Sequence, residues 1–366
     1  MKMVTIVGAR PQFIKAAAIS RSVAAHNHAH PDRLVQEIIV HTGQHFAINM
    51  SDIFFQEMAI PAPDYRLEIH GLGHGAMTGR MLEEVEKVLQ REAPDCVLVY
   101  GDTNTTLAGA LAAAKLHLPV AHVEAGLRSF NRAMPEEVNR ILTDHLATWL
   151  FCPTPVAMEH VHNEGLDRRA GVRVVQCGDV MVDVLYHFAP LARGHSATSR
   201  AGIADGYLLC TLHRAELTDD DGRLARVFKV LLDLAREHDI VMPLHPRTRQ
   251  ALQRLDLLPH GSPKLRVIDP VGYLQMLDLL DHAGLVLTDS GGLQKEAYLM
   301  GRGVVTLRQE TEWTETVTAG YNFLAGFDPA AIHAGVVRML GRHVDNTQAF
   351  YGRGDASQHI LASLVG

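Results

Sequence analysis

Short apolar runs alternate with helical segments along most of the chain, and this alternation is the feature that most restricts the fold. The run 3–7 leads into a helix through a Gly-Ala-Arg-Pro turn, and the run 96–100 leads into an alanine-rich helix. Such alternation is typical of parallel sheets, because each returning strand needs a crossover. We therefore predict an α/β protein with a doubly wound parallel sheet, whose expected strands in the first half are 3–7, 34–41, 96–100, 116–123 and 149–153.

A second alternating series follows a polar, glycine-bearing connection at 191–206. Its expected strands are 207–211, 240–244, 265–268, 285–288 and 304–307. A chain of 366 residues is too long for one ordinary domain. We expect GT-B architecture: two Rossmann-like domains at 1–170 and 171–350, the active site in the cleft between them, and a C-terminal helix at 351–366 packing back on the first domain.

Composition narrows the possible partners and the compartment. The formal net charge is −7, so nucleic acid is not an expected partner, and no apolar run reaches the roughly 18 residues of a membrane span. The chain enters an apolar strand at once, without the hydrophobic region of a signal peptide. The four cysteines are far apart and three lie in apolar runs, as is typical of reduced core thiols. A cytoplasmic location is expected.

The segment 122–140 concentrates charge directly after an apolar strand. It reads H-V-E-A-G-L-R-S-F-N-R-A-M-P-E-E-V-N-R. Unpaired charge in a dry core costs on the order of several kcal/mol, so these groups are either paired or in a cleft. A loop at the carboxyl end of a parallel strand is where α/β proteins place active sites. We interpret this segment as half of a catalytic cleft, carrying Glu124, Glu136, Glu137, Arg128, Arg132 and Arg140.

Two further strand ends in the first half carry charged side chains. Arg10 and Lys15 follow the first strand, where they could bind an anion, although Arg10 alone could also be an ordinary surface residue. Asp102 follows the strand 96–100 after Gly101. Two interpretations of Asp102 remain open, a helix-capping carboxylate and an acid of the cleft.

The second half offers a candidate site for a phosphate group. The strand 285–288 ends in T-D-S-G-G-L-Q-K-E, where Ser290, Gly291 and Gly292 open a helix whose backbone N–H groups could bind a phosphate. Glu296 follows in that helix, where it could bind a ribose diol. A plain glycine-rich turn is the alternative interpretation. Cationic pairs at other strand ends favour the anion site: His213 with Arg214, and His245 with Arg247.

No metal or cofactor is expected. His26, His28 and His30 stand at a polar helix end before Pro31, and we interpret them as a solvated loop rather than a metal cluster, because no acidic or cysteine ligand accompanies them. No G-x-S-x-G motif indicates acyl transfer. The Arg-Gly-Asp sequence at 353–355 is interpreted as a coincidence.

Motifs spread over nearly the whole chain resemble the non-hydrolysing UDP-N-acetylglucosamine 2-epimerase family. In order, they are G-A-R-P-Q-F-I-K, H-T-G-Q-H, G-D-T-N-T-T-L-A, H-V-E-A-G-L-R, M-P-E-E-V-N-R, L-H-R-A-E, L-H-P-R-T, T-D-S-G-G-L-Q-K-E-A and Q-E-T-E-W-T-E. The resemblance implies a GT-B fold, no metal or nicotinamide, and inversion of carbon 2 of a UDP-sugar. It implies elimination of UDP to a 2-acetamidoglucal, followed by re-addition of UDP.

The resemblance also assigns roles residue by residue. It implies catalytic roles for Asp102, Glu124, Glu136 and His213. It implies UDP contacts for Arg10, Lys15, His245, Tyr273, Met276, Ser290, Gly291, Gly292 and Glu296. Supporting positions in the cleft are Gln44, His45, Arg128, Arg140, Arg214, Arg247 and Glu312. A homodimer is implied as well.

Interconversion of UDP-N-acetylglucosamine and UDP-N-acetylmannosamine is the first expectation. H-T-G-Q-H-F, R-S-F-N and T-E-W also resemble the branch acting on UDP-2,3-diacetamido-2,3-dideoxyglucuronic acid, an intermediate for O-antigen sugars. Phe46 stands where many members have an arginine, which puts allosteric activation by UDP-N-acetylglucosamine in doubt. The alternatives are a GT-B glycosyltransferase, a hydrolysing epimerase and, less favoured, a nucleotide-sugar sensor. The carboxylates at 102, 124 and 136 favour the epimerase.

Overall fold

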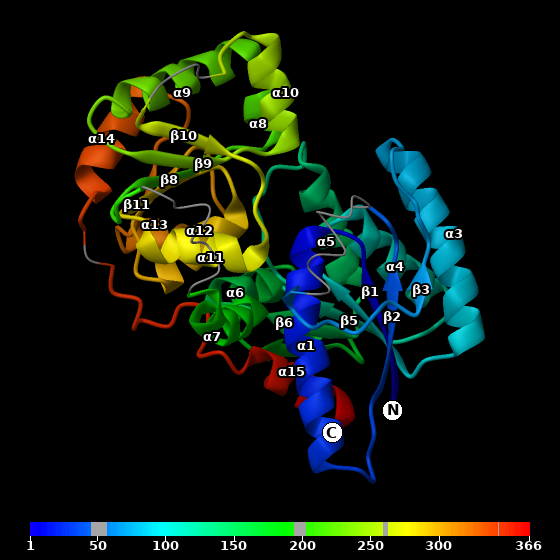
Figure 1. Cartoon of the computed structure of the whole chain (residues 1–366). Coiled ribbons are helices and arrows are strands. Elements are labelled where there is room, and N and C mark those ends of the chain that lie inside the picture. The colour runs from blue at the N-terminus through cyan, green and yellow to red at the C-terminus, as the bar shows by residue number, and fades with distance from the viewer. Residues whose placement is uncertain (45–56, 194–202, 259–262, 343) are drawn as a thin grey trace. The chain divides into compact units, whose positions relative to one another are not determined.

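The computed structural model describes residues 1–44, 57–193, 203–258, 263–342 and 344–366. Internal contacts divide the chain into two compact units (Figure 1). The first unit comprises Met1–His187 with Phe350–Gly366, and the second comprises Phe188–Ala349. Helix α7, Val180–Ala192, carries the boundary.

The described part of the first unit is built on a seven-stranded parallel sheet in the order β3-β2-β1-β4-β5-β6-β7. The order reverses between β1 and β4, and such a switch point is where open α/β sheets bind ligands. The strands are β1 Lys2–Val7, β2 Gln36–His41, β3 Tyr65–Arg66, β4 Cys96–Tyr100, β5 Val120–Val123, β6 Trp149–Cys152 and β7 Arg173–Gln176.

Helices cover both faces of this sheet (Figure 1). On one face α3, α4 and α5 pack side by side, and on the other α1 packs against α15. Pro11 opens α1 and Thr103 caps α4, as expected for helix starts. The helices are α1 Arg10–Ala29, α3 His74–Glu92, α4 Asn104–Lys115, α5 Pro135–Leu146, α6 Pro155–Asn163 and α15 Ala356–Val365, with the 3-10 turn Leu166–Arg168.

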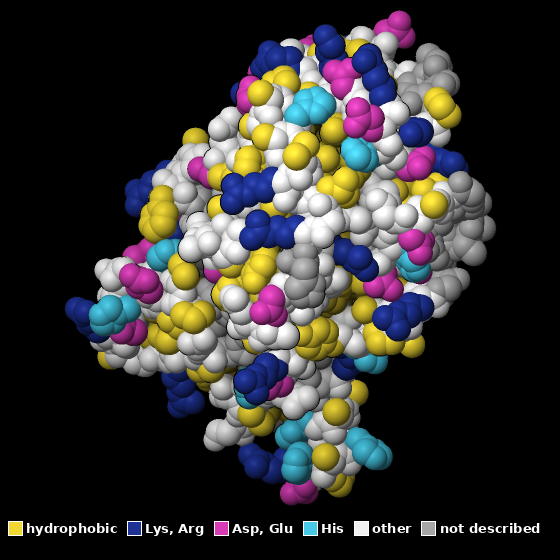
Figure 2. All heavy atoms as spheres, turned by 90° about the vertical axis from the view of Figure 1, so that its left-hand side faces the viewer, with side chains coloured by type: hydrophobic (Ala, Val, Ile, Leu, Met, Phe, Trp, Pro, Cys, Tyr) yellow, Lys and Arg dark blue, Asp and Glu magenta, His cyan; other side chains and the backbone are white. Residues whose placement is uncertain are grey.

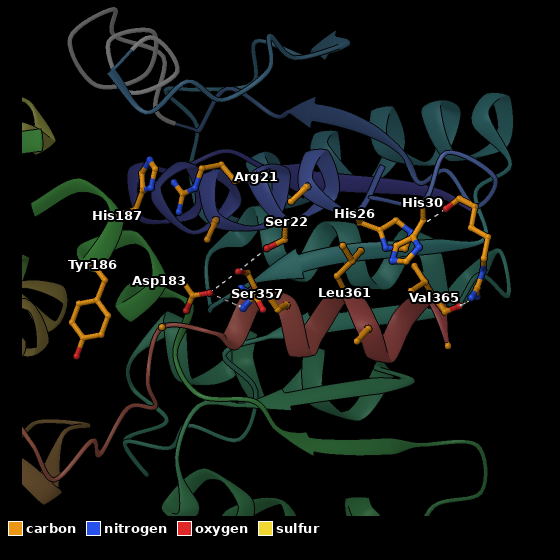
Figure 3. Close-up of a pocket in the computed structure, with 17 residues that line it drawn as sticks. Arg21, Ser22, His26, His30, Asp183, Tyr186, His187, Ser357, Leu361 and Val365 are labelled. Carbon is orange, nitrogen blue, oxygen red and sulfur yellow. Dashed lines mark hydrogen bonds between the residues drawn. The ribbon is translucent and has the colours of Figure 1, made fainter. Parts of the chain in front are cut away.

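Helix α15 is fixed to the first unit through a buried aspartate of α7. Asp183 accepts hydrogen bonds from the backbone N–H of Ala356 (3.2 Å) and from the N–H (2.8 Å) and hydroxyl (2.5 Å) of Ser357. Ser22 of α1 donates to the same hydroxyl at 2.8 Å (Figure 3). These groups line a groove of about 870 Å³ between α1, α7 and α15, which contains none of the predicted site residues. The C-terminal segment therefore belongs to the first unit.

The described part of the second unit is a six-stranded parallel sheet in the order β10-β9-β8-β11-β12-β13. Its strands are β8 Leu208–Thr211, β9 Ile240–Pro243, β10 Leu265–Ile268, β11 Leu285–Thr288, β12 Val304–Thr306 and β13 Asn322–Leu324. Its helices are α8 Ala215–Thr218, α9 Asp221–Leu234, α10 Pro246–Arg254, α11 Tyr273–His282, α12 Gly291–Leu299, α13 Thr314–Thr318 and α14 Pro329–Met339.

Buried apolar strands form the cores of both units, and the four cysteines lie in them as free thiols. Burial raises the pKa of Cys96 to about 12, so this thiol is not reactive near neutral pH. Among the described residues, no helix is both long and apolar enough to cross a membrane. On the face shown in Figure 2, Lys and Arg side chains are interspersed with Asp and Glu.

The structure corrects two expectations about elements. The domain boundary at 170 is too early, because β7 pairs with β6 and belongs to the first sheet. The C-terminal helix begins at Ala356 rather than at 351. His26 and His28 lie in the last turn of α1, with His30 as its C-cap, so these histidines stand at a helix end as expected. Histidines gather at the lower end of Figure 2, where this turn lies in Figure 1.

We expect the substitution Gly8→Ala to destabilise the protein by about 1–3 kcal/mol, the usual effect of overpacking a core. A β-carbon at Gly8 would collide with the hydroxyl groups of Thr42 and Thr105, which lie 2.8 Å from each other. Urea unfolding measures the effect. Gly79→Ala in α3 is the control, since a β-carbon there meets open space and should stabilise the helix by about 0.4–1 kcal/mol. Equal effects at both positions would contradict the packing explanation.

Candidate active site

Two ion pairs lie at the carboxyl edge of the first sheet. Asp102 follows β4 and Glu124 follows β5, and the register pairs Tyr100 with Val123, so both carboxylates lie at the same edge. Lys15 of α1 forms an ion pair with Glu124, and the exposed fractions of these side chains are 7% and 11%. Arg140 of α5 forms an ion pair with Asp102, the guanidinium side chain being 6% exposed and the carboxylate side chain 31%. The carboxylate of Asp102 therefore remains accessible.

The backbone around these pairs adopts left-handed conformations. Glu124 has φ +72°, which is uncommon for a residue with a side chain and costs on the order of 1 kcal/mol. Gly101 has φ +61°, and a β-carbon there would lie 3.2 Å from the Glu124 carboxylate and 3.5 Å from the Lys15 ammonium. Glycine at 101 thus leaves room for the Lys15–Glu124 pair. Strain at a charged residue of this kind is a recurring property of functional sites.

Glu137, rather than its neighbour Glu136, joins this network. Its carboxylate accepts the backbone N–H groups of Ser129 and Phe130, both at 2.9 Å, and an N–H of Arg140 at 3.1 Å. Arg140 therefore links Glu137 to Asp102. Glu136 lies half-buried in the first turn of α5, so its catalytic role stays a prediction.

A fully buried aspartate of α5 binds to residues on both sides of Glu124. Asp144 of α5 lies 2.7 Å from His122 Nδ1 and accepts hydrogen bonds from the Gly126 N–H (3.1 Å) and Arg128 Nη1 (2.7 Å). His122 Nε2 lies 2.8 Å from the carbonyl oxygen of Gly101. The two ring nitrogens therefore face oxygen atoms of two different segments, α5 and the turn after β4. The network ties the loop after β4 to the loop after β5.

The charge of Asp144 follows from its neighbours. Burial raises the pKa of this carboxyl, but the hydrogen bond and charge of His122 and those of Arg128 outweigh it, so the pKa lies below the usual value. Arg128 also donates to both oxygens of Glu164 at 2.7 Å. Arg128, a predicted cleft residue, is thus buried inside this supporting network.

The turn after β1 is held by Gln12, a residue that the sequence analysis did not single out. Its side-chain oxygen accepts the N–H groups of Gly8 (2.8 Å) and Ala9 (3.0 Å), and its amide nitrogen donates to the Tyr100 carbonyl at 3.0 Å. The turns after β1 and β4 are thereby connected. Predicted residue Arg10 lies half-buried at the start of α1.

Of the two predicted residues after β2, one can be placed. The side-chain oxygen of Gln44 accepts a hydrogen bond from the Thr105 hydroxyl at 2.9 Å, which links it to the start of α4. His45 lies outside the described residues, as does Phe46.

In the second unit, the predicted residues gather at the ends of the neighbouring strands β8 and β11. Ser290 caps α12 by accepting the Leu293 N–H at 3.4 Å, and Gly291 and Gly292 are the first residues of that helix. The positive end of the helix is therefore lined by backbone N–H groups. His213 and Arg214 follow β8, which pairs with β11.

Charged and aromatic side chains surround Gly291. A β-carbon there would lie 3.6 Å from Arg214 Nη2, 3.6 Å from Trp313 Nε1 and 3.8 Å from Glu312 Oε2. Glu312 accepts two hydrogen bonds from Arg308, at 2.9 and 3.2 Å. Burial raises the pKa of Glu312, but Arg308 and the charge of Arg214 outweigh it and lower the pKa to about 2. Arg214 and Glu312 therefore lie close to the start of α12.

The other predicted contacts of the second unit occupy different environments. His245 caps α10, with Nδ1 accepting the Arg247 N–H at 3.2 Å, and its ring centroid lies 5.8 Å from that of His213. The Arg247 guanidinium pairs with exposed Asp219 at 2.7 Å. The remaining three, Tyr273, Met276 and Glu296, are buried in α11 and α12.

The site contains residues that the sequence analysis missed. The sequence analysis named Glu137 as part of the charged segment 122–140. It assigned no role to His122, Asp144 or Asp289. His122 opens the H-V-E-A-G-L-R motif, and Asp289 precedes Ser290, so both were visible as polar residues at strand ends. Within the described residues, no group of three or more His, Cys, Asp or Glu side chains is arranged to hold a metal ion.

Two parallel, doubly wound units with charged residues at the carboxyl ends of their strands define an α/β protein of the GT-B class, as expected. The sequence model of the UDP-N-acetylglucosamine 2-epimerase family matches residues 27–365. The UDP-2,3-diacetamido-2,3-dideoxy-D-glucuronate 2-epimerase of Pseudomonas aeruginosa is 52% identical to this chain over 368 residues, covering 100% of this chain and 99% of that protein.

Solved structures agree with the sequence comparison. The crystal structure of Methanocaldococcus jannaschii UDP-GlcNAc 2-epimerase in complex with UDP-GlcNAc and UDP is 40% identical, with a TM-score of 0.90, and covers 100% of this chain and 99% of that chain. The Neisseria meningitidis UDP-GlcNAc 2-epimerase bound to UDP-GlcNAc is 30% identical, with a TM-score of 0.89 and full coverage of both chains (100% each). The chain belongs to the UDP-N-acetylglucosamine 2-epimerase family, whose members are isomerases.

Proposed function

We propose that the protein is a non-hydrolysing UDP-sugar 2-epimerase. The observation that carries the proposal is the two ion pairs at the ends of β4 and β5, Asp102–Arg140 and Glu124–Lys15. Each pair places a carboxylate next to a cation at the same edge of the sheet, and two such carboxylates suit the removal and return of a proton. Family membership supports the same reaction class.

The proposed reaction breaks and re-forms two bonds. A carboxylate takes the proton from carbon 2 while the bond from carbon 1 to the diphosphate oxygen breaks, and UDP leaves with the electron pair to give a 2-acetamidoglucal. UDP then returns to carbon 1, and a proton is delivered to the opposite face of carbon 2. Because the proton on carbon 2 is not acidic, stabilisation of the departing diphosphate by fixed cations and helix dipoles must assist its removal.

We assign the roles as follows. Asp102 and Glu124 act near the abstracted proton, Glu136 acts on the opposite face, and His213 acts beside the leaving phosphate. The start of α12, with Ser290, Gly291 and Gly292, binds the diphosphate through backbone N–H groups. The other proposed UDP contacts are Arg10, Lys15, His245, Tyr273, Met276 and Glu296.

We propose UDP-2,3-diacetamido-2,3-dideoxyglucuronate as the preferred substrate and UDP-N-acetylglucosamine as the second candidate. This reverses the order expected from the motifs. The support is the higher identity to the relative named for the uronate, 52% against 40% for a relative named for UDP-N-acetylglucosamine. Both sugars carry UDP and an acetamido group at carbon 2, so the chemistry is the same.

Steady-state kinetics with the two UDP-sugars tests the substrate assignment. We expect kcat/KM to be at least about 100-fold higher for the diacetamido uronate, since a site built to bind a charged substituent rejects an analogue that lacks it. Both reactions should end at an equilibrium mixture of two UDP-sugars. A preference for UDP-N-acetylglucosamine would overturn the substrate order, and release of free UDP with a free sugar would overturn the non-hydrolysing reaction.

We further propose a cytoplasmic homodimer that supplies a sugar for O-antigen or another surface polysaccharide. Val138 and Leu142, one helical turn apart on α5, are 41% and 45% exposed, and such apolar pairs suit a subunit interface. Light scattering coupled to size exclusion measures the assembly. A mass of one chain, about 40 kDa, would contradict the dimer.

A further inference from the structure

Asp289 is a buried carboxylate at the end of β11, and none of the roles assigned above includes it. Thr288, the last residue of β11, pairs in register with Thr211, the last residue of β8. Asp289 comes one residue after the end of β11, and His213 comes two residues after the end of β8. The register therefore brings Asp289 beside His213, although 76 positions separate them in the chain.

Both oxygens of Asp289 are directed at the turn that carries His213. Oδ2 accepts the backbone N–H of His213 at 2.8 Å and that of Arg214 at 2.9 Å. Oδ1 lies 3.1 Å from Nδ1 of the His213 ring. The carboxylate side chain is 1% exposed, whereas the imidazole is 39% exposed. The ring is thus held from the protein side and remains accessible on its other side.

Asp289 is ionised in this environment. Burial raises the pKa of its carboxyl, but the charge and hydrogen bond of His213 and the backbone N–H groups of Arg214 and His213 outweigh burial, so the pKa lies below its usual value. A charged carboxylate can only accept hydrogen bonds, and Oδ1, a buried oxygen without another hydrogen-bond partner among the described residues, faces Nδ1 at 3.1 Å, so the pair favours the ring form that carries its proton on Nδ1. The neighbouring His245 ring, 5.8 Å away between centroids, completes the aromatic surroundings of His213.

We propose that Asp289 is a positioning residue that acts through His213 by fixing its tautomer and ring orientation. The inference rests on the proposed role of His213 beside the leaving phosphate. With Nδ1–H held by Asp289, Nε2 is the nitrogen available to the substrate. In the protonated ring Nε2–H donates to the diphosphate oxygen as that oxygen takes the electron pair of the breaking bond. Asp289 also stabilises the positive charge of that ring.

The substitution Asp289→Asn separates this role from simple support of the turn. The single oxygen of asparagine can keep the two backbone N–H groups, which turns its NH₂ group toward Nδ1. Nδ1 must then accept, and the neutral ring must carry its proton on Nε2. We expect kcat to fall about 10- to 100-fold, the usual effect of losing a partner that orients a reactive group, with the Kd for UDP unchanged.

Nitrogen-15 NMR of histidine-labelled protein reports the tautomer directly. The His213 resonances among the 22 histidines are assigned by difference with a His213→Gln variant. We expect Nδ1–H in the neutral ring of the wild type and Nε2–H in Asp289→Asn. Asp328→Asn is the matched control, because Asp328 also accepts a backbone N–H, as the N-cap of α14, and asparagine caps equally well. That variant should retain the wild-type tautomer and kcat.

A double-mutant cycle shows whether Asp289 works through His213. In the His213→Gln background, Asp289→Asn should cause no further loss of kcat. An equal loss in both backgrounds, or an unchanged tautomer in Asp289→Asn, would overturn the inference. If the wild type epimerises neither UDP-sugar, the proposed function fails, while the NMR measurement still decides whether Asp289 fixes the ring.

Discussion

Replacing Glu124 with glutamine is expected to lower kcat for epimerisation by about 10²- to 10⁴-fold, the usual contribution of a general acid or base. Glutamine keeps the shape of the side chain but cannot take a proton, and it removes the negative charge that pairs with Lys15 in a site where the two side chains are only 11% and 7% exposed. The rate of deuterium incorporation at carbon 2 should fall by the same factor, since the lost step is proton transfer.

The control for this prediction is another glutamate paired with a lysine. Glu83 lies 3.0 Å from Lys87 on α3, but its side chain is 66% exposed, and an exposed pair contributes about 0–1 kcal/mol. Glu83→Gln should therefore retain the wild-type rate. Near-normal exchange at carbon 2 in Glu124→Gln would remove Glu124 from the mechanism.

The second large effect concerns stability. We expect Asp144→Asn to lower the free energy of unfolding by about 3–5 kcal/mol, because it removes one partner of a buried charged network and leaves Arg128 unpaired on that side. The carboxylate of Asp144 is 0% exposed and also binds His122 and the Gly126 N–H. Urea unfolding at neutral pH measures the difference between the variant and the wild type.

The pH dependence of this difference has a definite sign. The folded-state pKa of Asp144 lies below the value of 3.8 for an ordinary aspartate, so the unfolded state binds the proton more readily. The stabilisation is therefore complete above about pH 4 and is lost as the pH falls through the folded-state pKa. Asp167→Asn is the control, because its carboxylate is 32% exposed and pairs with exposed His162. A stability loss in Asp144→Asn no larger than in this control would contradict the network's role.

The alternation of apolar runs and helices was sufficient to predict two parallel sheets, because a buried parallel strand reads as a short continuous apolar segment. Three edge strands escaped prediction. β3 has two residues and β13 has three, too few for a periodic pattern, and β7 reads R-V-V-Q, which is half polar. The domain boundary was misplaced because β7 was missed.

The positions of Asp102, Glu124 and Ser290 could be predicted, because each polar side chain follows a recognisable strand end. Their partners could not, because each pairing depends on sheet register. Asp144 meets His122 across 22 positions, and Asp289 meets His213 across 76. The choice between the adjacent residues Glu136 and Glu137 could not be predicted either. It depends on where α5 begins, because that sets which of the two side chains faces Arg140.

Proton NMR of the protein with each UDP-sugar in deuterated water tests the proposed reaction most directly. For UDP-2,3-diacetamido-2,3-dideoxyglucuronate we expect a new anomeric signal of the manno configuration, deuterium at carbon 2, and UDP still attached. The same exchange with UDP-N-acetylglucosamine alone would keep the reaction and change the substrate. Absence of deuterium at carbon 2 with both sugars, or release of free UDP, would contradict a non-hydrolysing 2-epimerase.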